Sequence, residues 1–206
     1  MLRLHLIRHG STEAMGRILC GRTPGISLNE AGKKQAQALG RGFAAFRDWA
    51  GLYVSPVQRA RETAEPIAKA LGCDAYVDER FSEIDYGEWT GRTFDEVRAD
   101  PRWERYNRNR SLHAVPGGES LLDVQQRAWA GVSDIVAAHP QGVVGIVTHA
   151  DVIRALLLLL LAMPLDCIMR LQIAPASVST VFVAPGSDPI VHQMNATIEN
   201  TLHTTA

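Results

Sequence analysis

The stretch LRLHLIRHG at residues 2–10 begins the alternation of strands and helices in this chain. Its leucines alternate with polar residues, which indicates a β-strand. The run ends at a glycine, so the strand delivers Arg8 and His9 to its carboxyl end. In open α/β sheets that end of a strand is where ligands bind.

Helices and strands alternate after this first strand. Apolar residues recur at three- and four-residue spacing from Asn29 to Phe46 and predict a helix. A short strand from Leu52 to Val54 runs into Ser55, which is expected to cap a helix carrying Arg59 near its start. Pro66 predicts a kink or a boundary in that helix.

The second half of the chain continues the alternation. A helix is expected from Ser120 to His139, followed by a strand from Val143 to Thr148 that is apolar enough to be buried on both faces. His149 emerges at its end. Asp151 is expected to cap the next helix, whose leucine run at 156–161 is too short for a membrane span and predicts a buried helix.

This pattern predicts one α/β domain over residues 1–206, built as a three-layer sandwich with a mostly parallel sheet and helices on both faces. Two closing strands are expected at Val178–Val183 and Ile190–Met194. Residues 79–119 lack a sustained period and predict a partly helical excursion from the core, of the kind that often lines a site.

Composition narrows the possible partners. The net charge of -1 and the pI near 6.7 provide no global positive field, so neither nucleic acid nor an anionic membrane is expected as a partner. The three cysteines are dispersed and indicate reduced thiols. With no apolar export signal in the opening residues, a cytoplasmic protein is expected.

Four features are expected to meet at one edge of the sheet: Arg8-His9 after the first strand, Arg59 after the second, Glu83 in the excursion and His149 after a later strand. Ordinary interpretations compete with a site. Arginines are commonly salt-bridged at the surface, and a strand-end histidine is commonly a satisfied core residue.

Six blocks in order resemble the histidine phosphatase superfamily, also called the phosphoglycerate mutase-like family, over most of the chain. Any one block is weak, but six in the family's order are specific. They are LIRHGSTE at 6–13, GISLNEAGKKQA at 25–36, SPVQRARETAEPIA at 55–68, EIDYGEWTG at 83–91, PGGES at 116–120 and VTHADVIRAL at 147–156.

The resemblance implies a phosphatase that needs neither metal nor cofactor and acts on a small phosphorylated metabolite. In that family's pattern His9 is the nucleophile, Arg8, Arg59 and a cationic His149 hold the phosphate, and Glu83 is the proton donor. The residue types suit these roles, because a neutral imidazole is nucleophilic and arginine binds phosphate oxygens in pairs. A carboxyl kept protonated by burial can donate to the leaving oxygen.

Alternatives stay open for several residues. Asp85 and Glu88 lie close to Glu83, although the family's spacing selects Glu83. Metal ligation by His9 and His149 is disfavoured beside two arginines. The aromatic residues of the excursion either line a pocket or form a small satellite core; they are Trp89, Trp103 and Tyr106.

Three departures from the mutase pattern favour hydrolysis: Ile84 replaces an arginine, Met15 an asparagine and Ala150 a glycine. Met15 also puts one phosphate-side hydrogen bond in doubt. Mutase-type transfer and a noncatalytic phosphate-binding module are the alternatives. A homodimer is compatible with the sequence. Further substrate contacts are expected from proximity at Ser11, Thr12, Gly21, Arg22 and Tyr86.

Overall fold

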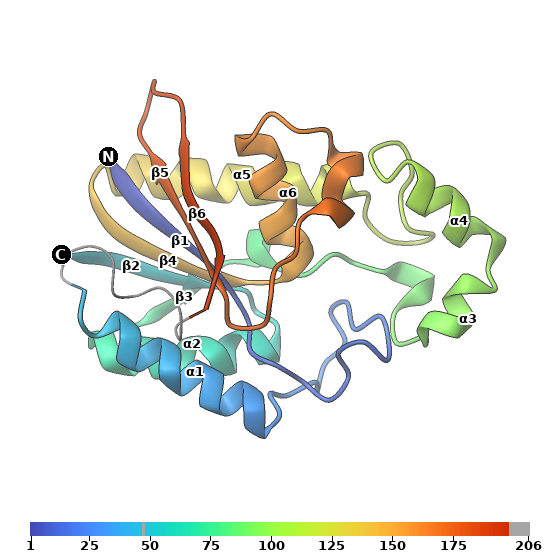
Figure 1. The fold of residues 1–206 in the computed structure, drawn as a ribbon, viewed down its shortest axis with the longest axis horizontal. Coiled ribbons are helices and arrows are strands. Elements are labelled where there is room, and N and C mark those ends of the chain that lie inside the picture. Colours follow the sequence, from blue (N-terminus) through green and yellow to red (C-terminus); the bar gives the residue numbers. More distant parts are fainter. Residues whose placement is uncertain (47, 198–206) are drawn as a thin grey trace.

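A computed structural model describes residues 1–46 and 48–197. Within these residues six strands form one sheet in the order β3-β2-β4-β1-β5-β6 (Figure 1). Strands β1 to β4 are parallel, whereas β5 runs antiparallel to β1 and β6 antiparallel to β5. The expected mostly parallel sheet is therefore confirmed. The strands are β1 (Leu2–Arg8), β2 (Trp49–Val54), β3 (Ala75–Val77), β4 (Gly142–Thr148), β5 (Val178–Val183) and β6 (Ile190–Ala196).

Helices cover both faces of the sheet, as expected for a three-layer sandwich. Helices α1 (Glu30–Phe43) and α2 (Gln58–Leu71) lie on one face, and α5 (Leu121–Ala138) and α6 (Ala150–Leu160) lie on the other (Figure 1). Strand β1 serves both layers, because Leu4 packs in the cluster with α5 and α6 while Ile7 packs in the cluster with α1 and α2.

The excursion at 79–119 is partly helical, as expected. It contains short 3-10 helices η1 (Glu79–Phe81) and η2 (Gly87–Trp89) and helices α3 (Phe94–Arg98) and α4 (Pro101–Arg108), and it projects from one end of the sheet (Figure 1). Its two ends meet, because the Glu119 amide donates to the Asp85 carbonyl at 3.0 Å and the Asp85 amide donates to Glu119 Oε2 at 3.0 Å.

The aromatic residues of the excursion neither line an open pocket nor form a separate satellite core: Trp89 and Tyr106 belong to the main hydrophobic cluster with α5 and α6, and Trp103 packs against it. Trp89 is fully buried, and its ring lies 5.3 Å from that of Trp103 and 5.6 Å from that of Tyr106. Its Nε1 donates to Asp100 at 3.0 Å, which satisfies the buried indole.

Two expected helix caps are wrong. Helix α2 begins at Gln58 with Val57 as N-cap and no side-chain cap. Ser55 lies two residues before that N-cap, and its hydroxyl bonds the Val57 amide at 3.2 Å and His149 Nε2 at 2.8 Å. Helix α6 begins after His149, and the Asp151 carboxylate in its first turn binds other side chains.

Two helices also differ from expectation in extent. Helix α1 ends at Phe43, three residues before the expected Phe46. Helix α2 continues through Pro66 without a boundary. A Cβ on Gly40 of α1 would lie 2.5 Å from the Pro66 carbonyl oxygen, so these helices pack backbone to backbone at that point.

The leucine run lies in a largely buried helix, as expected: Leu156, Leu157 and Leu158 are at most 1% exposed. Across residues 1–46 and 48–197, no helix combines the length and apolar content that a membrane crossing requires. Residues 198–206, included in the expected single domain, lie outside the described residues.

One of the polar residues that alternate with the leucines of β1, His5, is buried. His5 is 4% exposed, bonds Thr180 Oγ1 at 3.0 Å and lies 5.5 Å from the Phe43 ring. Burial, with a smaller contribution from the positive charge of Arg3, lowers the pKa of His5 from 6.5 to about 3. Between these values the unfolded chain binds a proton at this residue that the folded chain does not.

We therefore expect His5 to destabilise the fold as pH falls from 6.5 toward 3, by about 1.4 kcal/mol per pH unit. His5→Asn should make the slope of unfolding free energy against pH shallower by that amount, measured by urea denaturation between pH 6 and 4. His192→Asn, at an exposed position of β6, is the control. Identical slopes in the parent and His5→Asn would contradict this origin.

Candidate active site

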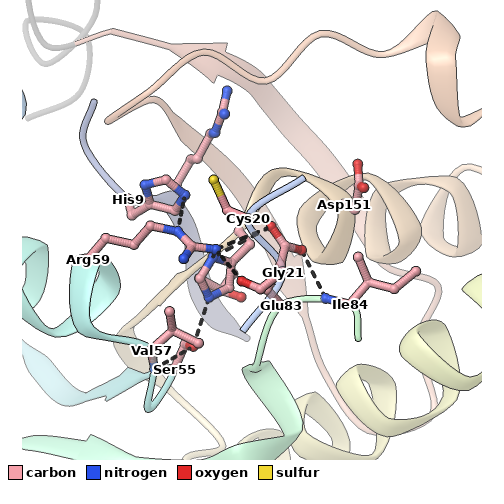
Figure 2. A network of polar contacts seen from close by, with 12 residues as sticks. His9, Cys20, Gly21, Ser55, Val57, Arg59, Glu83, Ile84 and Asp151 are labelled. Atoms are coloured by element: carbon pink, nitrogen blue, oxygen red, sulfur yellow. Dashed lines mark hydrogen bonds and ion pairs between the residues drawn. The ribbon is translucent and has the colours of Figure 1, made fainter. Parts of the chain in front are cut away.

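Segments far apart in the chain end at the same edge of the sheet. Strand register pairs Arg8 of β1 with Thr148 of β4, so His9 and His149 follow side by side, with ring centroids 5.2 Å apart. Arg59 enters from the first turn of α2, and Glu83 lies just after η1. The side chains of His9, Arg59 and Glu83 point toward one another (Figure 2).

His9 is held as a neutral imidazole. Its Nδ1 lies 2.7 Å from the Gly10 carbonyl oxygen, which can only accept, so Nδ1 carries the proton and Nε2 presents a lone pair. Burial first, and then the charges of Arg59 and Arg8, lower the pKa of His9 well below its ordinary value. An imidazole in this state is chemically able to act as a nucleophile.

Arg59 joins the main parts of the site. Its Nε donates to His9 Nε2 at 3.1 Å, and its Nη2 donates to the Gly21 carbonyl at 2.9 Å and to His149 Nδ1 at 3.2 Å. The side chain is 2% exposed. Its Nη1 is buried and has no hydrogen-bond partner among residues 1–46 and 48–197, so this guanidinium can take a further acceptor.

His149 is neutral in this arrangement, so the expectation of a cationic side chain is wrong here. A guanidinium cannot accept, so His149 Nδ1 accepts from Arg59, and Nε2 donates to Ser55 Oγ at 2.8 Å. Burial and the charge of Arg59 lower the pKa of His149 well below its ordinary value. The cation is disfavoured because the ring is fully buried beside a buried arginine.

Glu83 has the opposite shift. Burial first, and then the negative charge of Asp151, raise the pKa of Glu83 to about 7, against the opposing effect of Arg59. Its Oε1 accepts from the Ile84 amide at 3.0 Å, while Oε2 lies 3.6 Å from His149 Nδ1 and 3.8 Å from Arg59 Nη2. A carboxyl with this pKa can donate or accept a proton near neutral pH.

The backbone at Glu83 is clamped by two arginines. Arg22 Nε and Arg127 Nη2 donate to its carbonyl oxygen at 2.8 and 3.2 Å. Both arginines are also paired with Glu119, at 2.8 and 2.9 Å. Glu119 belongs to the PGGES block, so the clamp explains why that block accompanies Glu83.

Arg8 approaches from the end of β1. Its Nη1 donates to the Ile173 carbonyl at 2.5 Å, and its Nη2 faces Met15 Sδ at 3.6 Å. A thioether is a weak acceptor and offers no donor. Met15 therefore lies beside Arg8, which the family resemblance predicts to bind phosphate, and adds no hydrogen-bond donor at that place. Arg8 Nε is buried and without a hydrogen-bond partner in the described part of the chain.

The structure brings three of the five expected substrate contacts into this network: Gly21 binds Arg59, Arg22 binds Glu83, and the Tyr86 hydroxyl donates to Asp151 Oδ2 at 2.7 Å. The other two belong to the loop after β1. The Ser11 amide donates to Gln35 of α1 at 2.9 Å, and Thr12 is buried.

Sequence reasoning missed several residues of the network. The sequence pattern predicts helix caps at Ser55 and Asp151 and predicts no role for Glu119 and Arg127, which bind the Glu83 backbone or each other. Cys20 also lies at the site, beside Arg59 and Glu83 (Figure 2). Their positions near strand ends could have indicated that Ser55 and Asp151 belong to the site. Ser55 directly follows β2, and Asp151 lies two residues after His149. Among the described residues, no group of three or more His, Cys, Asp or Glu side chains is placed to hold a metal ion.

The chain resembles a known protein family, a curated protein and two solved structures. The model of the histidine phosphatase superfamily (branch 1) matches residues 4–197. The bifunctional protein Rv2228c of Mycobacterium tuberculosis is 37% identical over 192 residues, which cover 91% of this chain. That alignment covers 52% of Rv2228c, so the chain spans about half the length of this curated relative.

Two solved structures resemble the whole fold. YhfR of Bacillus stearothermophilus is 33% identical, with a TM-score of 0.87 over 95% of this chain and 97% of that chain. The mycobacterial glucosyl-3-phosphoglycerate phosphatase Rv2419c is 28% identical, with a TM-score of 0.85 over 95% of this chain and 99% of that chain.

The two buried, unpartnered arginine nitrogens predict oxyanion binding. We expect inorganic phosphate at about ten times its dissociation constant to stabilise the fold by about 1.4 kcal/mol, a rise of about 2–6 °C in melting temperature. Arg59→Gln should lose most of this rise, measured by differential scanning fluorimetry. Arg98→Gln, on the exposed face of α3, should keep it. A full rise in Arg59→Gln would place the phosphate elsewhere.

Proposed function

The chain belongs to the histidine phosphatase superfamily, and on this premise we propose that it is a metal-independent phosphatase that hydrolyses a small phosphate monoester through a phosphohistidine on His9. One observation carries the proposal: His9 Nδ1 bonds the Gly10 carbonyl, so the lone pair of Nε2 is directed at the guanidinium of Arg59. A phosphate bound by that guanidinium would meet the lone pair.

In the first proposed step, His9 Nε2 attacks phosphorus and the bond from phosphorus to the ester oxygen breaks. Arg8 and Arg59 hold the nonbridging oxygens, whose charge must be stabilised through the transition state. His149 joins them as a donor once its Nδ1, which accepts from Arg59 in the free site, takes up a proton. The Arg59 Nε–H, which donates to His9 Nε2, turns to a phosphate oxygen and frees the lone pair. Glu83 gives its proton to the leaving oxygen.

In the second step, water attacks the phosphohistidine. Glu83, now ionised, takes a proton from this water as the bond between phosphorus and His9 Nε2 breaks. Inorganic phosphate leaves and Glu83 is protonated again. A pKa of about 7 suits both half-reactions, because the carboxyl is populated in both states near neutral pH.

The substrate class is a small phosphorylated metabolite, and we place the reaction in the cytoplasm. Support for the substrate class comes from the resemblance to Rv2419c, which is a phosphatase of glucosyl-3-phosphoglycerate. Hydrolysis rather than mutase-type transfer is supported by Ile84, which is fully buried in the core and gives the site no basic group at that position.

We expect His9→Ala to lower kcat on p-nitrophenyl phosphate by at least about 10³-fold, because the covalent route is lost. Acid-labile, alkali-stable phosphate labelling from a ³²P-ester should vanish with it. His192→Ala, on the exposed edge strand, is the control. Labelling that survives in His9→Ala would remove His9 from the mechanism.

The same assay run in EDTA tests metal independence, and full activity is expected. Loss of turnover that zinc or magnesium restores would contradict it. A parent enzyme that binds phosphate but turns over no ester in a panel of phosphorylated metabolites would instead be a noncatalytic binding module.

Glu83→Gln should slow an alkyl phosphate about 10²-fold or more and p-nitrophenyl phosphate far less, because nitrophenolate scarcely needs a proton to leave. In the parent enzyme, kcat/KM for the alkyl ester should fall as pH rises through about 7, where Glu83 loses its proton. The measurement is a pH profile with both esters. An equal loss on both esters in Glu83→Gln would argue against proton donation.

A further inference from the structure

Gln35, in the second turn of α1, bonds the loop that follows His9. Its side-chain Oε1 accepts from the Ser11 amide at 2.9 Å. The bonded atom is the oxygen of the Gln35 amide, because a backbone N–H can only donate. The proposed reaction gives Gln35 no part, although it touches the chain two residues from the nucleophile.

Helix α1 reaches this loop because glycines stand where the two backbones meet. A Cβ on Gly32 would overlap the Ser11 carbonyl oxygen, and a Cβ on Gly10 would lie 2.8 Å from the Gly32 carbonyl oxygen. The Ser11 carbonyl also accepts from the Asn29 amide at 3.0 Å. The start of α1 therefore binds Ser11 through both its N–H and its C=O.

The peptide group between Gly10 and Ser11 connects Gln35 to His9. In a planar trans peptide the N–H and the C=O point in opposite directions. The N–H of this peptide donates to Gln35, and its C=O is the oxygen that lies 2.7 Å from His9 Nδ1. A bond to α1 on one side of the peptide thus directs the carbonyl toward the imidazole on the other side.

The proton of His9 is held on Nδ1 from two sides in the free site. The Gly10 carbonyl accepts from Nδ1, and Arg59 Nε donates to Nε2 at 3.1 Å (Figure 2). The second restraint is lost when Arg59 turns to a phosphate oxygen. A ring with its proton on Nε2 could then donate to that phosphate, but it would have no lone pair with which to attack phosphorus.

We propose that Gln35 is a positioning residue, which keeps the proton of His9 on Nδ1 while phosphate is bound by orienting the Gly10 carbonyl toward the ring. The bond from the Ser11 amide to Gln35 also strengthens that carbonyl as an acceptor, because linked hydrogen bonds polarise one another. The inference rests on the proposed function, since it takes His9 as the nucleophile.

The test locates the proton on His9 directly. Protein labelled with ¹⁵N in its histidine rings is saturated with inorganic phosphate at about pH 8, and two-bond ¹H–¹⁵N spectra show which ring nitrogen carries the proton. The His9 signals are identified by their absence in His9→Asn. The parent should carry the proton on Nδ1. In Gln35→Met, which has similar size but only a weak acceptor, part of the proton population should move to Nε2.

Two variants control for effects on the helix. Gln35→Glu keeps an acceptor oxygen at the same place and should retain the parent proton position. Gln37→Met makes the same replacement at an exposed position of α1 and should also retain it. If Gln35→Met does not fold, Gln35→Lys provides the comparison, because an ammonium group offers no acceptor.

Turnover and phosphate binding should separate in Gln35→Met. We expect kcat on p-nitrophenyl phosphate to fall about tenfold, the effect of one lost hydrogen bond. The dissociation constant of inorganic phosphate should not rise, because a ring that is protonated on Nε2 still donates to phosphate. Gln35→Glu should restore most of the lost kcat.

A parent-like proton position on His9 in Gln35→Met would overturn the inference, even if kcat falls. A protein that binds phosphate and hydrolyses no ester would refute the proposed function, whereas the ring spectra would still decide the role of Gln35. If phosphate does not bind, Arg59→Leu removes the restraint at Nε2 without a ligand. Addition of Gln35→Met to that variant should then move the proton, and an unmoved proton would overturn the inference.

Discussion

The site depends on one buried contact, the hydrogen bond from Arg59 Nε to His9 Nε2. A guanidinium that is 2% exposed forces the groups around it to adapt, because few solvent dipoles screen its charge. Both histidines stay neutral beside it, and each uses its other ring nitrogen on a fixed partner, Gly10 or Ser55. The charge of Arg59 also favours the ionised form of Glu83. Burial and the negative charge of Asp151 oppose this effect and raise the pKa of Glu83.

A site of this kind is costly for the fold, because buried charges that lack full pairing destabilise the native state. The cost is offset by the layers around it. Leu4 and Ile7 pack in the hydrophobic clusters on opposite faces of β1. Helix α1 packs closely on the loop directly after His9, because a Cβ on Gly10 would lie 2.8 Å from the Gly32 carbonyl oxygen.

Elements with a strong period were predictable from the sequence, and elements whose role depends on a distant partner were not. The strand at 143–148 and the helix at 120–139 were expected almost at their observed bounds, because burial alone determines their patterns. The sequence predicted that His9, Arg59, Glu83 and His149 would meet at one edge of the sheet, and the structure places these side chains together. Their catalytic roles stay predictions. The hydroxyl of Ser55 and the carboxylate of Asp151 are both suitable for capping a helix. In the structure Ser55 instead bonds His149, 94 residues away, and Asp151 bonds Tyr86, 65 residues away. The charge of His149 likewise depends on Arg59, which no local pattern reports.

Two hydrogen bonds between Asp85 and Glu119 close the base of the excursion. The chain enters and leaves the outer part of the excursion at this pair of hydrogen bonds, and Trp89 and Tyr106 anchor the segment in the main hydrophobic cluster. Lengthening such a loop costs little free energy, because closure entropy grows slowly with length. The outer part of the excursion can therefore change in length while the backbone at Glu83 stays bonded to Arg22 and Arg127.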